Sequence, residues 1–160
     1  MKTLVAYFSA SGTTEKAARY IAEQLKCDIY EIEPVVLYTA DDLNWTSQNS
    51  RANREMMMPS TRPAIDGHVD NMDEYQRIIL GFPIWWSTAP HIINSFLESY
   101  DMNGKKIVLF ATSSGSDLKK VAGDLMRSAI GSRIITGKVI NQISADECDR
   151  FINKLKTERE

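Results

Sequence analysis

The sequence has few of the residues that mark metal-binding, disulfide-stabilised or nucleic-acid-binding proteins. Its two cysteines, Cys27 and Cys148, are isolated, without Cys-x-x-Cys or metal-ligand spacing, which indicates a reduced, cytoplasmic protein without a metal site. A net charge of only −2 gives no reason to expect binding to nucleic acid or to an anionic membrane. No apolar run approaches the length of a transmembrane helix, and Met1 and Lys2 lead directly into a strand-like run instead of a signal peptide.

Two common nucleotide-binding loops are absent as well. The chain contains no Gly-Lys-Ser/Thr ending of a P-loop, and Gly12 alone cannot supply the three glycines of the dinucleotide fingerprint. The remaining composition, 43% hydrophobic and 25% charged over 160 residues, is normal for a globular protein. We therefore expect a single domain over residues 1–160, long enough to bury a substantial core.

The stretch from Thr3 to Leu25 has the order strand, short loop, helix. Residues 3–8 form a nearly unbroken apolar run, as a parallel strand buried on both faces should. The polar loop Ser-Ala-Ser-Gly-Thr-Thr follows at 9–14, and from 15 to 25 the apolar residues recur on one face of a helix. The order predicts that the loop ends on a helix N-terminus.

This loop has the chemistry of a phosphate-binding site. Unpaired backbone N–H groups and the helix dipole attract an anion, and the hydroxyls of Ser9, Ser11, Thr13 and Thr14 can add donors. Gly12 lets the backbone approach a ligand closely. A second interpretation stays open, because Ser, Thr and Gly before a helix are also ordinary capping and turn residues.

Further along the chain, strand-like and helix-like segments alternate. Strands are predicted at 28–32, 76–82, 106–112 and 133–140, and helices at 41–57, 90–100, 117–130 and 144–155. The alternation predicts an α/β three-layer sandwich with a five-stranded parallel sheet in the doubly wound order 2-1-3-4-5. In that order strands one, three and four are neighbours, so the loops at 9–14, 83–88 and 112–117 should converge on one site.

A long polar segment, residues 33–73, connects the second and third strands. The helix predicted within it at 41–57 would be capped by Thr39 and carry Arg51 and Glu55 as an i,i+4 pair. A connection of this length is either a flap over a site or a surface excursion that covers a sheet edge. Both interpretations remain open.

Several side chains have both a functional and a structural interpretation. Arg51, Arg54 and Arg62 could reach a nicotinamide phosphate or an anionic substrate, or could simply be solvated. The methionine run at 56–58 could form a flexible apolar lid, although packing is the simpler expectation. His91, at the start of a predicted helix, could donate a proton or be an ordinary polar surface residue.

The loops after the third and fourth strands offer groups that suit a flat ring. Trp85 and Trp86 can contact the face of such a ring, and Ser113, Ser114 and Gly115 can bond its polar edge. The two tryptophans also fit a core or a subunit interface. Together with the phosphate-type loop, these residues favour a phosphorylated planar aromatic ligand.

Three motifs in register resemble those of the flavodoxin-like family of FMN-binding proteins, and the resemblance covers nearly the whole chain. Residues 9–14 are similar to the family's Thr/Ser-x-Thr/Ser-Gly-x-Thr phosphate loop. Gly-Phe-Pro-Ile-Trp-Trp at 81–86, followed by Thr-Ala-Pro at 88–90, resembles the loop that wraps the isoalloxazine in a short flavodoxin-like subgroup. Residues 112–116 stand where the family's second flavin loop lies. The resemblance implies a flavodoxin-like fold with FMN as cofactor.

The resemblance also implies roles for particular residues. The FMN phosphate would be held by Ser9, Ser11, Gly12, Thr13 and Thr14. The ring would be held at one edge by Pro83, Ile84, Trp85 and Trp86, and at the other by Ser113, Ser114 and Gly115. The resemblance requires no side-chain acid, base or nucleophile, so no catalytic residue is predicted.

Two departures from the flavodoxin pattern bear on the reaction. Flavodoxins proper usually place an aromatic residue in the fourth-strand loop and are typically strongly acidic, whereas residues 113–116 contain no aromatic and the chain is nearly neutral. Both departures weaken the electron-carrier role. The subgroup resemblance and the missing aromatic favour a flavin-dependent reductase that takes electrons from NAD(P)H or a redox partner protein and passes them to a small acceptor such as a quinone. A flavodoxin-type electron carrier, a scaffold without cofactor, and a homodimer that completes the site remain open.

Overall fold

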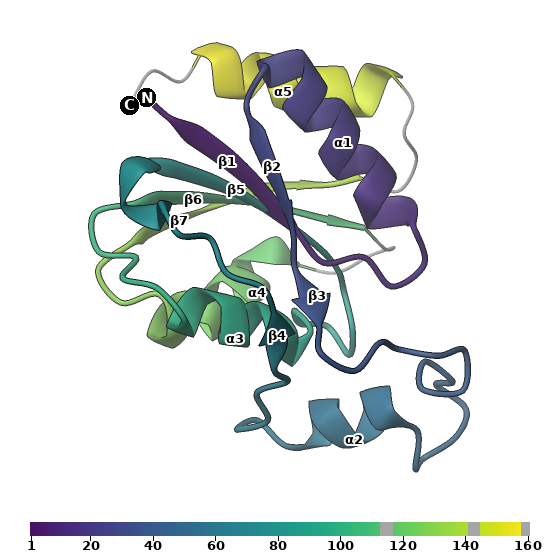
Figure 1. Cartoon of the computed structure of the whole chain (residues 1–160). Helices are drawn as coiled ribbons and strands as arrows, with labels where there is room; N and C mark the ends of the chain where they lie inside the picture. Colours follow the sequence, from purple (N-terminus) through teal and green to yellow (C-terminus); the bar gives the residue numbers. More distant parts are fainter. Residues whose placement is uncertain (113–116, 141–144, 158–160) are drawn as a thin grey trace.

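The computed structural model describes residues 1–112, 117–140 and 145–157, and five of its strands form one parallel sheet (Figure 1). These strands are β1 (Thr3–Tyr7), β2 (Asp28–Glu31), β5 (Arg77–Pro83), β6 (Lys106–Thr112) and β7 (Arg133–Val139). Their order across the sheet is β2-β1-β5-β6-β7, and every neighbouring pair is parallel. This is the predicted order 2-1-3-4-5, so the predicted fold class is confirmed.

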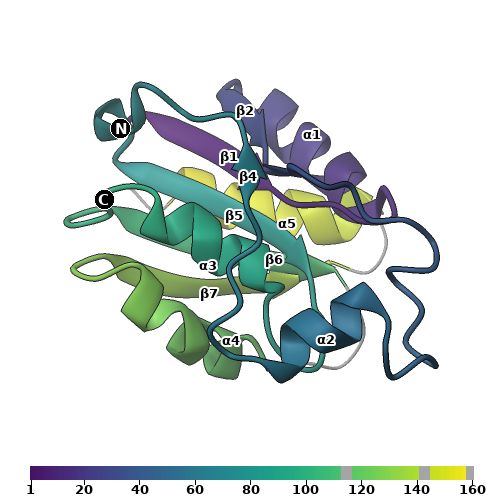
Figure 2. The ribbon, with the colours of Figure 1, turned by 60° about the horizontal axis from the view of Figure 1, so that its bottom comes forward.

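Helices cover both faces of the sheet (Figures 1 and 2). The helices are α1 (Thr13–Leu25) and α5 (Ala145–Thr157) on one face, and α3 (His91–Glu98) and α4 (Leu118–Leu125) on the other. Alternate residues of β1 supply the two cores: Val5 and Tyr7 pack with α1 and α5, whereas Leu4 and Ala6 pack with α3 and α4. Because β1 is buried on both faces, its sequence is apolar throughout.

Some element boundaries differ from the sequence-based expectation. The helix α3 stops at Glu98 instead of residue 100, and α4 ends at Leu125, where a 3₁₀ turn, η2 (Met126–Ser128), replaces the helix predicted to 130. The predicted start of the last helix at 144 lies outside the described residues. The strand β7 is continuous through Gly137, because a bulge opposite Leu109 absorbs that residue. A Cβ on Gly137 would lie 2.0 Å from the Leu109 carbonyl oxygen, which only glycine avoids.

The long connection between β2 and β5 forms a folded excursion, residues 35–64, on the side of the sheet that carries α3 (Figure 1). Its two ends are joined by a short antiparallel pair, β3 (Glu33–Pro34) with β4 (Ile65–Asp66). Within it, α2 (Arg51–Met57) is the helix that forms. The helix predicted at 41–57 is therefore wrong over its first half.

Side-chain hydrogen bonds explain why this helix begins late. The N–H of Thr39 donates to the Asp42 carboxylate at 2.9 Å, and the N–H of Asp42 donates to the Thr39 hydroxyl at 3.2 Å, as at a helix start. The turn does not continue, because the Asn44 side-chain oxygen accepts from both the N–H (3.1 Å) and the hydroxyl (2.6 Å) of Thr46. Ser50 is the actual cap, accepting a backbone N–H of the first turn of α2 at 3.4 Å.

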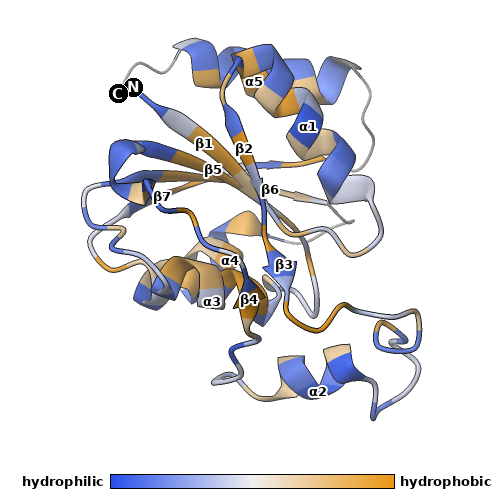
Figure 3. Cartoon of the chain, in the orientation of Figure 1, coloured by the Kyte–Doolittle hydropathy of each residue, from blue (hydrophilic) through white to orange (hydrophobic). Residues whose placement is uncertain are grey.

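Apolar residues are concentrated in the strands and in the helix faces that cover them (Figure 3). A further 3₁₀ turn, η1 (Met72–Glu74), precedes β5.

None of the helices in the described part of the chain has the length and apolarity needed to cross a bilayer. Within the same residues, no group of three or more His, Cys, Asp or Glu side chains is placed to hold a metal ion.

Candidate functional site

The first loop, residues 9–14, connects the carboxyl end of β1 to α1 as predicted. Gly12 occupies the N-cap position with a φ of +94°, a conformation that side-chain-bearing residues rarely adopt. A Cβ at Gly12 would meet no atom within 4 Å. Glycine is therefore needed here for the backbone conformation that starts the helix, and not for clearance from neighbouring atoms.

Two of the four hydroxyls in this loop are engaged within the protein. The Ser9 Oγ accepts from the N–H groups of Gly12 (3.0 Å) and Glu15 (3.2 Å), which closes the loop from the inside. Thr14 is buried, and its Oγ1 lies 2.7 Å from that of Thr112 at the end of β6. These two hydroxyls shape the loop and join it to a second strand.

The other two hydroxyls, on Ser11 and Thr13, face solvent. No hydrogen bond to another described residue uses either of them. The backbone N–H groups of Thr13 and Thr14, in the first turn of α1, also lack an acceptor in the helix, and they have none elsewhere in the described chain. The exposed side of the loop thus presents hydroxyl and N–H donors at a helix N-terminus, which suits an anion.

The tryptophan loop, residues 83–88, follows β5 and contains a tight turn. The N–H of Trp85 donates to the Thr88 carbonyl at 2.9 Å, and the N–H of Thr88 donates back at 3.0 Å. The central residues, Trp86 and Ser87, have φ of +51° and +63°, the left-handed values of a type I′ turn. Neither is glycine, so the turn carries backbone strain of the kind found at ligand sites.

The two tryptophans of this loop have different environments. Trp85 is 5% exposed and Trp86 is 50% exposed. The Trp85 ring packs edge-on against Phe8, Tyr38 and Trp45, with ring centroids 5.7, 5.4 and 5.7 Å away. Trp85 therefore belongs to the core, the structural alternative considered from the sequence, and Trp86 is the indole that faces outward.

Thr112, the residue that precedes the loop after β6, contacts both the first loop and the tryptophan loop. Three predicted site residues, Ser113, Ser114 and Gly115, lie outside the described residues. The carbonyl of Thr112 accepts the N–H of Ile84 at 3.1 Å, while the Thr112 hydroxyl meets Thr14. Pro83 and Ile84 are partly buried where β5 ends. The carboxyl ends of β1, β5 and β6 thus lie side by side, as the strand order predicts.

Two of the arginines considered as anion ligands are engaged with acidic partners. The Nε of Arg51 lies 3.0 Å from the Glu55 carboxylate, which confirms the predicted i,i+4 pair, and its guanidinium carbon lies 3.8 Å from the Tyr38 ring centroid. The Nε of Arg62 donates to both carboxylate oxygens of Glu98, at 2.9 and 3.1 Å. Neither side chain is simply solvated, and both serve to hold the excursion.

The remaining candidates from this region are divided. Arg54 is exposed. Met56 is buried in the core, as the packing interpretation requires, whereas Met57 and Met58 are exposed.

His91 begins α3, and its Nδ1 is shielded from solvent without a partner among the described residues. Burial lowers the His91 pKa below its usual 6.5, so the neutral imidazole is favoured at neutral pH.

A cavity of about 430 Å³ adjoins the first loop. Its lining includes Phe8, Ser9, Tyr38 and two acidic residues, Glu31 and Glu33. Burial raises the pKa of Glu31, and the charge of Glu33 raises it further. Because two acidic residues belong to its lining, an anion is favoured at the N-terminus of α1 over the cavity.

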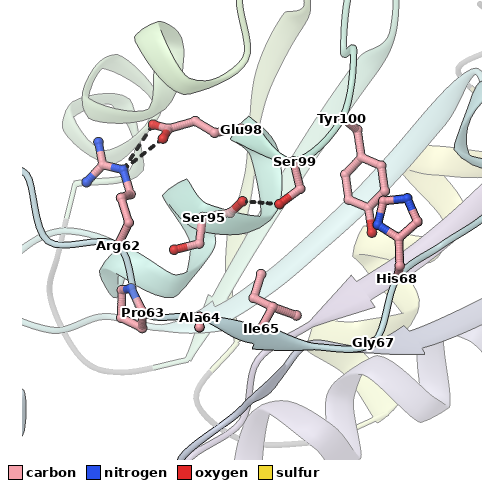
Figure 4. Close-up of a pocket in the computed structure, with 10 residues that line it drawn as sticks. All are labelled: Arg62, Pro63, Ala64, Ile65, Gly67, His68, Ser95, Glu98, Ser99 and Tyr100. Carbon is pink, nitrogen blue, oxygen red and sulfur yellow. Dashed lines mark hydrogen bonds and ion pairs between the residues drawn. The ribbon is translucent and has the colours of Figure 1, made fainter.

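A second cavity, of about 390 Å³, lies between α3 and residues 62–68 (Figure 4). The Arg62–Glu98 ion pair stands at one end of it, and at the other the His68 ring stacks on Tyr100 with centroids 4.7 Å apart. It shares no lining residue with the first loop or the tryptophan loop. It is therefore separate from the candidate site.

Sequence reasoning missed two aromatic residues of this region, Tyr38 and Trp45. Both come from the excursion, and both pack on Trp85. Tyr38 also packs on Phe8, with centroids 5.7 Å apart. One feature of the sequence could have identified Trp45. It is one of only three tryptophans and stands in an otherwise polar stretch, and a large aromatic side chain there is expected to pack against a partner.

Comparison with known proteins identifies the family of this chain. A family model described as Flavodoxin matches residues 2–155. The chain belongs to the flavodoxin family. Among curated proteins none is similar enough to count as a relative.

Solved structures of other proteins described as flavoproteins align with almost the whole chain. A Bacteroides eggerthii protein assigned as a flavoprotein is 37% identical, with 98% of this chain and 99% of that chain covered and a TM-score of 0.89. One from Bacteroides uniformis is 42% identical, covering 95% and 97% at a TM-score of 0.89. A Lactobacillus acidophilus flavoprotein, solved in complex with FMN, is 23% identical over 92% and 98% at a TM-score of 0.68, a likeness of fold.

Proposed function

We propose that this flavodoxin-family protein binds FMN and acts as a flavin-dependent reductase, passing electrons from a nicotinamide or protein donor to a small acceptor such as a quinone. The observation that carries the proposal is the meeting of the first loop and the tryptophan loop at the adjacent carboxyl ends of β1 and β5, joined through Thr112. Ligands of doubly wound folds bind at this edge of the sheet. Membership of the family and the FMN complex of the L. acidophilus relative support FMN as the cofactor.

The donors of the first loop fit a flavin phosphate. The exposed hydroxyls of Ser11 and Thr13 would donate to its oxygens, as would the N–H groups of Thr13 and Thr14, which have no acceptor among the described residues. Ser9 and Gly12 would keep the loop in the conformation that presents these donors. The loop has no cation, so phosphate binding would rest on hydroxyls, N–H groups and the dipole of α1.

The flavin ring would lie between the tryptophan loop and the loop after β6. The residues proposed to contact it are Pro83, Ile84 and Trp86 on one side, with Trp85 behind them, and Ser113, Ser114 and Gly115 on the other. Bound FMN supplies the redox chemistry, and the protein orients the ring and excludes water from part of it. The absence of an aromatic residue at 113–116 supports access of a small acceptor to one face of the ring.

A second candidate is a carrier of electrons between proteins. The exposure of three apolar side chains, Met57, Met58 and Trp86, favours it, because such residues suit a contact with a protein partner. The same side chains would suit a homodimer. These candidates share the cofactor and differ in what reduces it and what oxidises it.

The first experiment is a visible spectrum of the protein after saturation with FMN and desalting. Retained flavin absorbance is expected, and a colourless protein would point to a scaffold without cofactor. Steady-state oxidation of NADH and NADPH with a quinone acceptor then separates the two functions. Turnover with either nucleotide supports the reductase. No turnover, together with rapid reduction by a partner protein, would support the carrier.

A further inference from the structure

Trp45 is the aromatic residue that, among those described, contacts both indoles of the tryptophan loop. Its ring centroid lies 5.7 Å from that of Trp85 at an interplanar angle of 76°, and 6.3 Å from that of Trp86 at 41°. Trp45 is 42% exposed, close to the exposure of Trp86. The two outer indoles therefore form one edge of an aromatic cluster whose interior is Trp85.

The backbone that carries Trp45 is fixed by a buried amide. Asn53 on α2 is 3% exposed, and its Nδ2 donates to the carbonyls of Trp45 (3.2 Å) and Ser47 (2.6 Å). The N–H of Ala52 on the same helix donates to the Asp42 carbonyl at 2.9 Å. Because a buried side-chain donor is costly to leave unpaired, Asn53 holds the turn at 45–47 against α2.

The helix α2 is in turn docked on the domain. The Tyr38 hydroxyl donates to Glu55 at 2.5 Å, and Arg51, which pairs with Glu55, also donates to the Val36 carbonyl at 2.7 Å. Two residues of α2, Ala52 and Met56, are buried in the same core as Phe8 and Trp85. The excursion is thus packed onto the site and carries Trp45 to a defined position.

The turn that Trp45 contacts needs support from outside. Trp86 and Ser87 both have left-handed backbone conformations without being glycine, and such residues persist only where their surroundings hold them. Among the described side chains, the ring that packs on the Trp86 indole is that of Trp45. Trp45 thus supports the turn from a segment distant in the sequence, beside α4, whose Lys120 Nζ donates to the Ser87 carbonyl at 3.4 Å and whose Asp124 accepts from the Thr88 hydroxyl at 2.7 Å.

We infer that Trp45 is a positioning residue of the flavin site. Held by Asn53, it fixes the indole of Trp86 beside the bound ring and limits the access of water to that ring, and thereby strengthens FMN binding and sets the reduction potential of the flavin. The inference rests on the proposed binding of FMN at the tryptophan loop. The excursion would thus contribute to the flavin site through Trp45, a role that is not evident from the length of the excursion or from its helix α2.

The test compares three variants of the full chain. Trp45→Leu keeps apolar bulk but removes the ring, Trp45→Phe keeps a ring, and Met57→Ala is a matched control at an exposed apolar residue of the same excursion. We expect Trp45→Leu to weaken FMN binding roughly threefold to tenfold, the order that a lost aromatic pair produces. We also expect a less negative flavin reduction potential, because water stabilises the added charge. Trp45→Phe should recover most of both properties, and Met57→Ala should match the wild type.

A double-mutant cycle with Trp86→Leu tests whether Trp45 acts through Trp86. If it does, Trp45→Leu should change the FMN dissociation constant and the potential little once Trp86 is replaced. Equal effects in both backgrounds would overturn the inference, as would wild-type affinity and potential in Trp45→Leu. A Trp45→Leu chain that fails to fold would also overturn it, since Trp45 would then serve the fold itself. Failure of the wild-type protein to bind FMN would instead refute the proposed function.

Discussion

Replacing both Ser11 and Thr13 by alanine tests whether the exposed side of the first loop holds a phosphate. Both side chains face solvent, and neither hydroxyl bonds to another described residue. A hydrogen bond to a charged group contributes about 1.5–3 kcal/mol, so the loss of two should cost FMN binding at least ~3 kcal/mol, or roughly a hundredfold in affinity. The free energy of unfolding of the FMN-free protein should change by no more than about 0.5 kcal/mol, as for surface substitutions generally.

The matched control is Thr14→Val in the same loop. It removes a hydroxyl but keeps the side-chain shape, and it leaves the buried Thr112 hydroxyl without its partner at 2.7 Å. An unsatisfied buried polar group costs about 1–3 kcal/mol, so this variant should lose stability where the double variant does not. Titration of FMN by the quenching of its fluorescence gives the affinity, and urea unfolding of the FMN-free protein gives the stability. Unchanged affinity in the double variant, or unchanged stability in Thr14→Val, would refute the division of this loop into an inner and an outer pair of hydroxyls.

Three further substitutions test the packing around the site. Gly81→Ala should lower the free energy of unfolding by about 3 kcal/mol or more, measured in urea, because its Cβ would lie 2.0 Å from the ring of fully buried Phe110. Lys105→Met should cost about 1–3 kcal/mol in the same assay, because the buried Nζ donates to two backbone carbonyls at η1, at 2.9 and 2.7 Å. The Arg62 guanidinium lowers the pKa of Glu98 below its usual 4.5, so the stabilisation from this carboxylate is present above that pH and is lost as the pH falls through the lowered pKa. Glu98→Gln should therefore reduce the loss of stability below pH 4.5, and an unchanged pH profile would contradict this assignment.

The sequence was sufficient for the sheet because the central strands are buried on both faces. Runs such as Ile78–Leu80 are apolar without interruption for that reason, and their alternation with helical segments indicates a parallel, doubly wound sheet. The helix predicted at 41–57 failed because local side-chain bonds at Asn44 competed with the helical backbone. Such competition depends on the conformation that the segment adopts, and it does not change the hydrophobic periodicity of the sequence.

The candidate site was predictable in position and less so in detail. Four hydroxyls in one loop look alike in a sequence, yet Ser9 and Thr14 turn inward while Ser11 and Thr13 face solvent. Thr14 is turned inward by Thr112, a residue of another strand, and Ser9 by the N–H groups of Gly12 and Glu15. Trp45 was missed for a related reason, because its partners lie far from it in the chain and hydrophobic periodicity reports only on local elements.

The hydroxyl contact between Thr14 and Thr112 spans 98 positions of the chain. Parallel strands pair only after long crossover connections have closed, and contacts of large sequence separation form slowly. The first loop can therefore reach its final shape only once β1, β5 and β6 lie side by side. During synthesis on the ribosome, the chain should acquire no affinity for a phosphorylated ligand until β6 has emerged, and in refolding experiments ligand binding should accompany the last phase of sheet formation.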